Sequence, residues 1–122
     1  MAFRLVFSAA AERDRWVNFD HLFDSFCSFG EKPGEAVNHA AERVRSIRGS
    51  AHRICIALDR GTKRDDIFSG LHQLTIERAL FWHEIDDSEA VVGVLAAFFG
   101  GQDYIRRMML RLLERRVDGA RY

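Results

Sequence analysis

The spacing of apolar residues changes near residue 71 of this 122-residue chain, and this change constrains the fold more than any other feature. Before it, apolar side chains recur at intervals of three and four, the period of an amphipathic helix. After it they alternate or run together in short stretches, which is typical of strands. Helices grouped in one half and strands in the other predict an α+β fold. At this length, one domain spanning residues 1–122 is expected.

A short strand and a long helix are predicted at the N-terminus. Three apolar residues occupy alternate positions in residues 3–8, which is the period of a strand. Ser8 is a suitable N-cap for a helix over residues 9–29, where Glu12 and Asp14 suit the positive end of the helix dipole. Gly30 then follows as a natural stop.

A second helix is predicted to begin at Pro33, because a first turn does not need the missing N–H. Apolar residues continue at helical spacing to Leu58, and Gly49 marks a place where this helix can bend. The two helices are expected to form an antiparallel pair on a sheet, with an exposed Arg-rich outer face. The segment 59–66 has no apolar residue and is expected to be an exposed loop.

Three strands are predicted in the second half of the chain. They lie around Leu74 and Ile76, over residues 80–85, and over residues 90–99. Short polar breaks at residues 77–79 and 86–89 would join them as antiparallel hairpins. The last strand is apolar on both faces, which implies a central position or a covered outer face.

An amphipathic helix over residues 103–118 is predicted to close the chain. Asp103 can cap it, and an Arg-rich face lies opposite an apolar stripe formed by Ile105, Met108, Met109, Leu112 and Leu113. This stripe can close the protein's own core, dimerise or receive a partner. The full order is β-α-α-β-β-β-α: an N-terminal strand and helical hairpin packed on an antiparallel three-stranded meander, with an extra C-terminal helix.

The net charge of zero conceals strong segregation of charge along the chain. Residues 43–64 carry seven basic residues against Asp59, a balance of +6, and residues 104–122 carry six Arg against two acids, a balance of +4. Residues 1–42 stand at −3 and residues 65–103 at −7. This pattern predicts distinct positive and negative surfaces that steer partners, and solvated helix faces explain it equally well.

The two cysteines and five histidines do not suggest a metal or cofactor site. Cys27 and Cys55 fall on apolar faces of predicted helices, where they are expected to be buried as small hydrophobes. The histidines show no ligand spacing, so neither a metal nor a cofactor is expected. His83 and Glu84 are neighbours on a strand and point to opposite faces, which favours a structural role over a dyad.

Several other signals are absent from the sequence. The longest apolar run, residues 90–99, is too short to span a membrane, and residues 1–8 lack a signal-peptide layout. A cytoplasmic protein without membrane contact is therefore expected. No Gly-x-Ser-x-Gly elbow or Walker-type loop is present, so serine or nucleotide catalysis is not supported.

Three segments together resemble the ParE/RelE toxin superfamily. Residues 60–71, RGTKRDDIFSGL, are similar to a ParE-type basic loop before a Ser-Gly-Leu entry into a strand. Residues 81–86 resemble its aromatic third strand, and residues 94–103 its last strand. With the helical hairpin, the likeness covers residues 3–104 and favours a ParE-like over a RelE-like member.

This resemblance implies the toxin of a type II toxin–antitoxin system, associated with plasmid stabilisation and growth arrest. A cognate antitoxin would neutralise it in a hetero-oligomer, wrapping it as helix and extended chain. ParE-like members poison DNA gyrase without cutting it, whereas RelE-like members cleave mRNA on the ribosome. An inactive member that only binds is a third alternative.

The departures from the family pattern favour inhibition of DNA gyrase, and hence a protein that is not itself an enzyme. The family's last strand commonly carries Arg and His near its end. This chain has other residues there: Ala96, Ala97, Phe99, Gly101 and Gln102.

The resemblance also suggests three sets of site residues. The target-binding set is Arg78, Gln102, Tyr104, Arg106 and Arg107. The antitoxin-binding set is Trp16, Phe98, Met108, Met109 and Leu112. If the chain is an endoribonuclease, its catalytic groups are Arg60, Lys63, Arg64, Arg78 and Tyr104.

Overall fold

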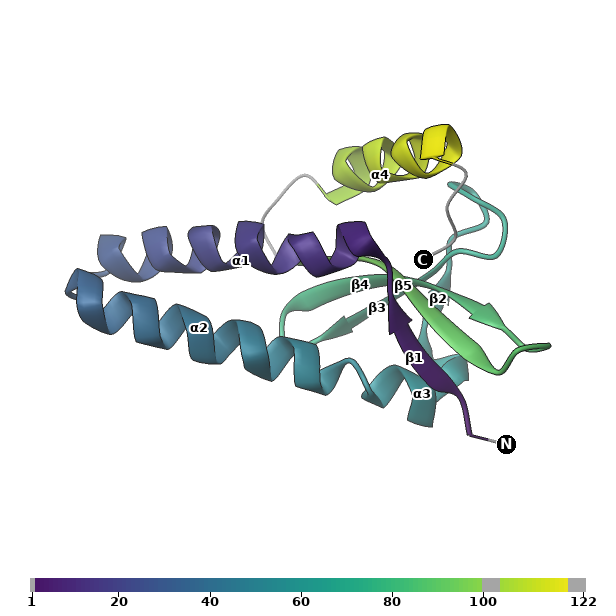
Figure 1. Ribbon diagram of the computed structural model, residues 1–122, viewed down its shortest axis with the longest axis horizontal. Helices are drawn as coiled ribbons and strands as arrows, with labels where there is room; N and C mark the ends of the chain where they lie inside the picture. Colours follow the sequence, from purple (N-terminus) through teal and green to yellow (C-terminus); the bar gives the residue numbers. More distant parts are fainter. Residues whose placement is uncertain (1, 100–103, 119–122) are drawn as a thin grey trace.

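The computed structural model describes residues 2–99 and 104–118, which fold into an α+β arrangement of one five-stranded sheet and four α-helices (Figure 1). Its elements, in chain order, are β1 (Arg4–Phe7), α1 (Ala9–Ser28), α2 (Pro33–Ser50), α3 (Arg53–Ile56), the 3-10 turn η1 (Leu58–Arg60), β2 (Thr62–Lys63), β3 (His72–Ile76), β4 (Ala79–Asp86), β5 (Val91–Phe99) and α4 (Tyr104–Asp118). The predicted order of a strand, two helices, three strands and a final helix is confirmed.

The sheet has the strand order β1-β5-β4-β3-β2. Strands β3, β4 and β5 form the predicted antiparallel meander, and β1 joins it parallel to β5. The α1–α2 pair extends well beyond the sheet at one end, while α4 lies above the sheet (Figure 1). Strand β5 is therefore a central strand, although its neighbour β1 spans only four residues.

Helix α1 begins and ends as the sequence predicts. The side chain of Ser8 accepts a hydrogen bond from the backbone N–H of Ala11 at 3.0 Å, which is the N-cap contact. After Ser28 the chain turns at Gly30, whose φ of +98° is a conformation that glycine adopts without a steric penalty.

The second helix is shorter than predicted. Helix α2 ends at Ser50, and two residues in a turn precede the short α3, so the expectation of one helix to Leu58 was wrong. The hydroxyl of Ser50 donates to the carbonyl of Ile47 at 2.7 Å, a local bond that competes with helix continuation. The turn brings Ala51 and Ile54 into the core, where both are fully buried.

The outer face of the helical hairpin is less uniformly exposed than predicted. The Arg48 guanidinium forms an ion pair with Glu12 and lies 4.4 Å from the ring centroid of Phe7. Arg43 is half-buried and donates to the carbonyl of Glu77 at 2.9 Å. These two arginines connect α2 to α1 and to the β3–β4 turn, although the Arg48 side chain is still partly exposed.

The segment 59–66 contains a strand that the sequence did not predict. Thr62 and Lys63 are exposed, as expected, but they pair with β3 as the edge strand β2. Gly61, just before this strand, lies close to β3 and β4. A Cβ at this position would be 3.3 Å from the backbone oxygen of Gln73 and 3.4 Å from the Cε1 atom of His83.

The two predicted hairpins are present. Glu77 and Arg78 have φ values of 51° and 70° and connect β3 to β4 as a two-residue turn, one residue shorter than the predicted break. Positive φ at both positions is the pattern of a type I′ turn. In the second turn, a side-chain oxygen of Asp86 accepts bonds from the Ser88 hydroxyl at 2.7 Å and the Glu89 N–H at 3.1 Å.

Strand β5 divides the interior into two hydrophobic cores. The first core, with side chains from β1, α1, α2 and α3, contains Ala11, Ile47, Ala51, Ile54, Ile76, Ala79, Phe81, Val92, Val94 and Ala97. The second core, closed by α4, contains Leu71, Leu80, Trp82, Leu95, Ala96, Phe98, Met108 and Leu112. The predicted covered outer face of the last strand is therefore confirmed, and α4 provides the cover.

The two cysteines are less buried than predicted. Cys27 and Cys55 are both free and half-buried. Cys55 packs against the first core, and partial burial raises the pKa of its thiol because the thiolate would lose solvation. Across residues 2–99 and 104–118, no helix combines the length and hydrophobicity that crossing a membrane requires.

His83 is fully buried in the described structure, and neither ring nitrogen has a hydrogen-bond partner. Burial, with the charge of the neighbouring His72, lowers the pKa of His83 from 6.5 to about 4. The ring of His83 stacks on the ring of His72, with 5.4 Å between the ring centroids.

The depressed pKa of His83 predicts acid sensitivity of the fold. In the unfolded chain His83 is protonated below pH 6.5, whereas in the folded chain it stays neutral until about pH 4. Between these two pH values, protonation of the unfolded chain lowers the free energy of unfolding as pH falls. The loss is about 3 kcal/mol. Urea unfolding should show that the free energy of unfolding decreases less between pH 7 and pH 4 for His83→Leu than for the unmodified chain. The control His72→Gln, at a half-buried position, should keep most of the decrease seen in the unmodified chain. An equal decrease of the free energy of unfolding in all three proteins would contradict the prediction.

Candidate functional site

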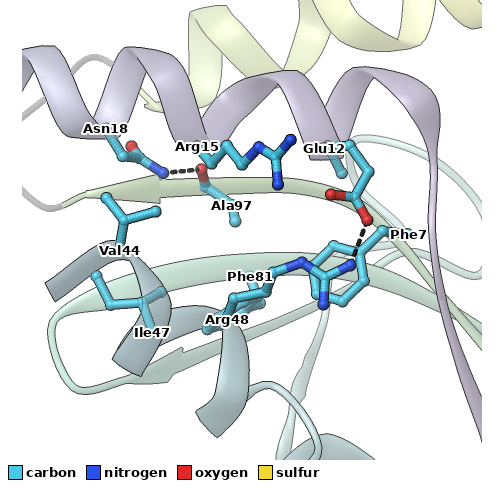
Figure 2. Close-up of a pocket in the computed structure, with 10 residues that line it drawn as sticks. Phe7, Glu12, Arg15, Asn18, Val44, Ile47, Arg48, Phe81 and Ala97 are labelled. Atoms are coloured by element: carbon cyan, nitrogen blue, oxygen red, sulfur yellow. Dashed lines mark hydrogen bonds and ion pairs between the residues drawn. The ribbon is translucent and has the colours of Figure 1, made fainter. Parts of the chain in front are cut away.

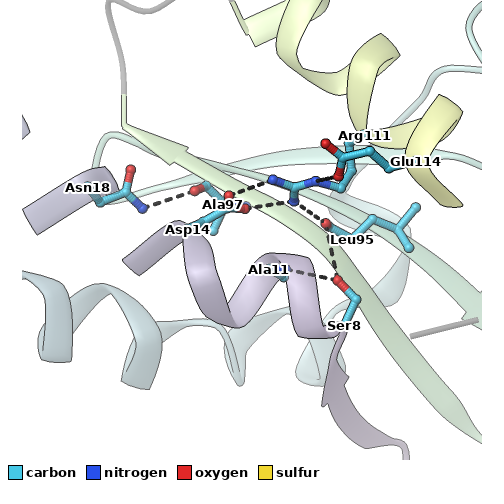
Figure 3. Close-up of polar contacts among 8 residues, drawn as sticks. All are labelled: Ser8, Ala11, Asp14, Asn18, Leu95, Ala97, Arg111 and Glu114. Carbon is cyan, nitrogen blue, oxygen red and sulfur yellow. Dashed lines mark hydrogen bonds and ion pairs between the residues drawn. The ribbon is translucent and has the colours of Figure 1, made fainter. Parts of the chain in front are cut away.

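The second half of β5 has one edge that no described strand covers. Strand β1 pairs only with Val91 to Val94, and the Ser8 N–H then closes this ladder by donating to the Val94 carbonyl at 2.9 Å. Beyond this point side chains from α1 and α4 bind the backbone of β5 (Figure 3). Such side-chain bonds replace a strand, because buried backbone groups need hydrogen-bond partners.

Two residues of α1 complete this edge at Ala97. The Ala97 N–H donates to Asp14 Oδ2 at 3.1 Å, and Asn18 Nδ2 donates to the Ala97 carbonyl at 3.0 Å. Both side chains belong to residues that are at least 95% buried. Asp14 and Asn18 therefore supply to Ala97 the two backbone hydrogen bonds that a neighbouring strand would otherwise make.

Arg111 of α4 joins the same edge. Its Nη1 donates to Asp14 Oδ2 at 3.0 Å and to the Leu95 carbonyl at 2.8 Å, while its Nη2 donates to Asp14 Oδ1 at 2.7 Å. Figure 3 shows the guanidinium between Asp14 and Leu95, with Glu114 on its outer side. This two-point contact compensates the buried carboxylate and fixes α4 to both α1 and β5.

The sequence-based interpretation missed this network. Asp14 was expected to serve the helix dipole, and Arg111 belongs to the Arg-rich face that was expected opposite the apolar stripe. A signal was present in the spacing, because Asp14 and Asn18 occupy the same helical face as Ala11 and Leu22. A carboxylate at a core position indicates a buried cationic partner.

The residues predicted to bind an antitoxin fall into two groups. Phe98, Met108 and Leu112 are buried together in the second core, whereas Trp16 and Met109 are 61% and 55% exposed. The predicted apolar stripe of α4 is thus split, with one part closing the protein's own core and the other part facing solvent.

The residues predicted to catalyse RNA cleavage do not converge. Arg64 Nε and Nη2 each donate to an oxygen of Asp66 at 3.0 Å, and Nη1 donates to Gln73 Oε1 at 2.8 Å. These contacts lower the pKa of Asp66, mainly through the hydrogen bond from Arg64. Arg60 and Lys63 are exposed nearby, but the charge of Arg64 is already compensated.

Arg78 lies at the other end of β3. Lys63 pairs with His72 at the start of this strand, whereas Arg78 occupies the turn after Ile76. Five strand residues separate the two ends, roughly 16 Å at about 3.3 Å per residue. The side chain of Tyr104 lies outside the described part of the structure. Arg78 and the basic residues Lys63 and Arg64 therefore lie at opposite ends of β3.

Three of the predicted target-binding residues, Arg78, Arg106 and Arg107, have side chains in the described part of the structure. Ile76 pairs with Ala79, and Ala79 pairs with Phe99, so the Arg78 turn lies beside the end of β5. The chain continues from that end towards α4, where Arg106 is exposed and Arg107 lies over the Phe98 ring at 5.1 Å. Gln102, and the side chain of Tyr104, lie outside the described residues.

A small pocket lies between α1, α2 and the sheet (Figure 2). Its wall is largely apolar, and its rim carries Arg15 and the ion pair between Glu12 and Arg48. Asn18 also lines it, with an Oδ1 atom that is buried without a hydrogen-bond partner. The carboxylate in the lining, Glu12, is paired with Arg48, and the described residues include no cluster of three or more possible metal ligands.

Comparison with known proteins gives a likeness of fold only. No protein-family description matches the sequence, and no curated protein matches it. A chain of the toxin–antitoxin complex RelBE2 from Mycobacterium tuberculosis superimposes with a TM-score of 0.53 at 14% identity, covering 81% of this chain and 99% of that one. A double-arginine mutant of the E. coli toxin RelE in the free state gives 0.55 at 8% identity, covering 93% and 99%.

The contact between Asp14 and Arg111 is predicted to be a major contributor to stability. Asp14→Ala leaves a largely buried guanidinium without its partner and should lower the free energy of unfolding by about 3 kcal/mol. The double variant Asp14→Ala/Arg111→Met should lower the free energy of unfolding by less than the sum of the two single variants. The difference should be about 1–3 kcal/mol. Urea unfolding of all three variants measures this coupling.

The ion pair between Glu12 and Arg48 provides a matched control. Its side chains are 36% and 46% exposed, so Glu12→Ala should cost less than about 1 kcal/mol. Equal costs for Glu12→Ala and Asp14→Ala would show that the buried position of Asp14 confers no special role.

Proposed function

We propose that this protein is the toxin of a type II toxin–antitoxin system. The fold it shares with two RelE structures over most of the chain supports this proposal, as do the three sequence segments that resemble the ParE/RelE superfamily. One of those structures is a toxin–antitoxin complex, which supports a cognate antitoxin as the partner of this chain.

The proposed action is inhibition of DNA gyrase by binding, without catalysis by the toxin itself. The observation that carries this choice is the failure of the candidate catalytic groups to converge, since Arg64 is compensated by Asp66 and Arg78 lies at the opposite end of β3. General acid–base chemistry and phosphate stabilisation need such groups around one reacting phosphate. A binding surface has no such requirement.

The proposed gyrase-binding surface is formed by Arg78, Arg106 and Arg107, with Gln102 and Tyr104 assigned to it from the sequence. The Arg78 turn lies beside the end of β5, and Arg107 lies over the ring of Phe98 near that end. Arg78 and Arg106 are exposed, and exposed cations accelerate encounter with an acidic partner. Gyrase and the alternative target, the ribosome, are both cytoplasmic, as is the proposed location of the toxin.

Ribosome-dependent cleavage of mRNA is the second proposed activity. It is favoured by the RelE identity of both structural neighbours and by two exposed cations, Lys63 in the edge strand β2 and Arg60 just before it. An active RelE-like site would have to recruit Arg64 away from Asp66 when RNA binds. An inactive, purely binding member of the superfamily is the third alternative.

Expression of this chain alone in a bacterium is predicted to arrest growth, with DNA damage, filamentation and intact transcripts. Arrest with cleaved transcripts would instead identify the RelE-like activity. Continued growth with abundant soluble protein would contradict both activities and favour the inactive alternative.

Purified protein should inhibit supercoiling by gyrase, and Arg78→Ala/Arg106→Ala should raise the half-inhibitory concentration about tenfold, a loss of about 1.4 kcal/mol in binding. The matched control is Arg53→Ala, an exposed arginine at the start of α3. Normal supercoiling at excess protein, or equal losses for both variants, would contradict the proposed surface.

A further inference from the structure

The turn between β3 and β4 has a backbone conformation that its two residues do not favour. Glu77 and Arg78 have φ values of 51° and 70°, and both side chains are exposed. Positive φ is unfavourable for a residue with a Cβ, so turns of this type usually contain Asn and Gly. Strained backbone of this kind persists where surrounding contacts hold it, and it is concentrated at functional sites.

Helix α2 supplies a contact that holds this turn. The Arg43 Nη2 atom donates to the Glu77 carbonyl at 2.9 Å, and the Ser46 hydroxyl lies 3.5 Å from Glu77 Oε2. The guanidinium carbon of Arg43 also lies 5.7 Å from the ring centroid of Phe99 at the end of β5. Arg43 therefore contacts both the turn and the strand end beside it.

The Glu77 carbonyl belongs to the peptide group that determines the turn type. A type I′ turn has positive φ at both central residues, whereas a type II′ turn has it only at the first. The two types differ by a rotation of the peptide group between the central residues, which here joins Glu77 to Arg78. A hydrogen bond from Arg43 to this carbonyl opposes the rotation and keeps Arg78 at positive φ. Arg43 thereby determines the direction in which the Arg78 side chain leaves the turn.

The chemistry of Arg78 indicates what it binds. Within residues 2–99 and 104–118, Arg78 forms no ion pair, so its guanidinium is available to a partner. A guanidinium binds a carboxylate or a phosphate through paired hydrogen bonds. The carboxylate of Glu77, the preceding residue, would repel a nucleic-acid backbone, which carries one negative charge per nucleotide. A carboxylate on a protein surface fits this turn better.

We propose that Arg43 is a positioning residue for target binding, because it holds the peptide group between Glu77 and Arg78 so that Arg78 binds a carboxylate of the target protein. This inference rests on the proposed function, in which Arg78 belongs to the gyrase-binding surface. Arg43 acts through Arg78 and does not contact the target itself. It adds a residue of α2 to a site that the sequence assigned to β3, β5 and α4.

The first test compares two arginines of α2 in the gyrase supercoiling assay. Arg43→Met keeps an unbranched side chain beside Phe99 but removes the donor, and it should raise the half-inhibitory concentration about fivefold. The matched control Arg45→Met, at an exposed position on the same helix, should leave this concentration unchanged.

A double variant separates positioning from a general effect on the fold. Arg43→Met/Arg78→Ala should inhibit gyrase as well as Arg78→Ala alone, because Arg43 acts only through Arg78. Independent losses that multiply in the double variant would mean that Arg43 has a structural role elsewhere, and they would overturn the proposal.

A change at Glu77 provides a rescue. Asn adopts positive φ more readily than other residues with a side chain, apart from Asp and His. Glu77→Asn should therefore restore inhibition to the Arg43→Met variant. Glu77→Gln removes the same charge without this backbone preference and should not restore it. Equal rescue by both changes would show that charge, and not turn conformation, is what Arg43 controls.

Nuclear magnetic resonance tests the turn conformation without gyrase. Positive φ brings the N–H and Hα protons of one residue close together, so Arg78 should give a strong nuclear Overhauser effect between them. Arg43→Met should weaken this signal, and Arg45→Met should not. An unchanged signal in Arg43→Met would overturn the positioning role, whatever the target.

Two further outcomes concern the target itself. Normal supercoiling with excess unmodified protein would contradict the proposed function and the target contact of Arg78 together, whereas the resonance signal decides the role of Arg43 separately. Binding of a labelled DNA duplex without gyrase, lost in Arg78→Ala, would assign Arg78 to phosphate groups and overturn the carboxylate contact.

Discussion

The structure depends on how the second half of β5 completes its backbone hydrogen bonds beyond the end of β1. Asp14 and Asn18 bind both backbone groups of Ala97, and Arg111 binds the Leu95 carbonyl while neutralising Asp14. A buried carboxylate without that guanidinium would be costly, so the position of α4 and the end of the sheet are determined together. One polar contact thereby joins α1, β5 and α4.

This arrangement gives the two sides of α4 different roles. The inner side closes the second core around Trp82 and Phe98, whereas Met109 and Leu113 on the other side are exposed. The candidate gyrase-binding surface lies at the end of the same strand, near the Arg78 turn.

Much of the fold could be predicted because local spacing determines it. The N-cap at Ser8, the stop at Gly30 and the apolar strand over residues 91–99 are properties of short segments, and the structure contains each of them. The predictions failed where distant contacts decide. Helix α2 stops early because Ala51 and Ile54 enter the core, and β2 forms because β3 offers a free edge. For the candidate site, the sequence identified the basic residues but not which of them form ion pairs with a carboxylate, as Arg64 does with Asp66.

The sequence alone determined the order of helices and strands, the two-sided burial of the last strand and the amphipathic nature of the final helix. These follow from the periods of 3.6 and 2 that side chains must obey in helices and strands. Only the tertiary structure decided that Asp14 meets Arg111, that Arg64 meets Asp66, and that α4 buries Met108 while exposing Met109. Such pairings join residues across turns and between elements, and their partners are chosen by packing, which no local pattern encodes.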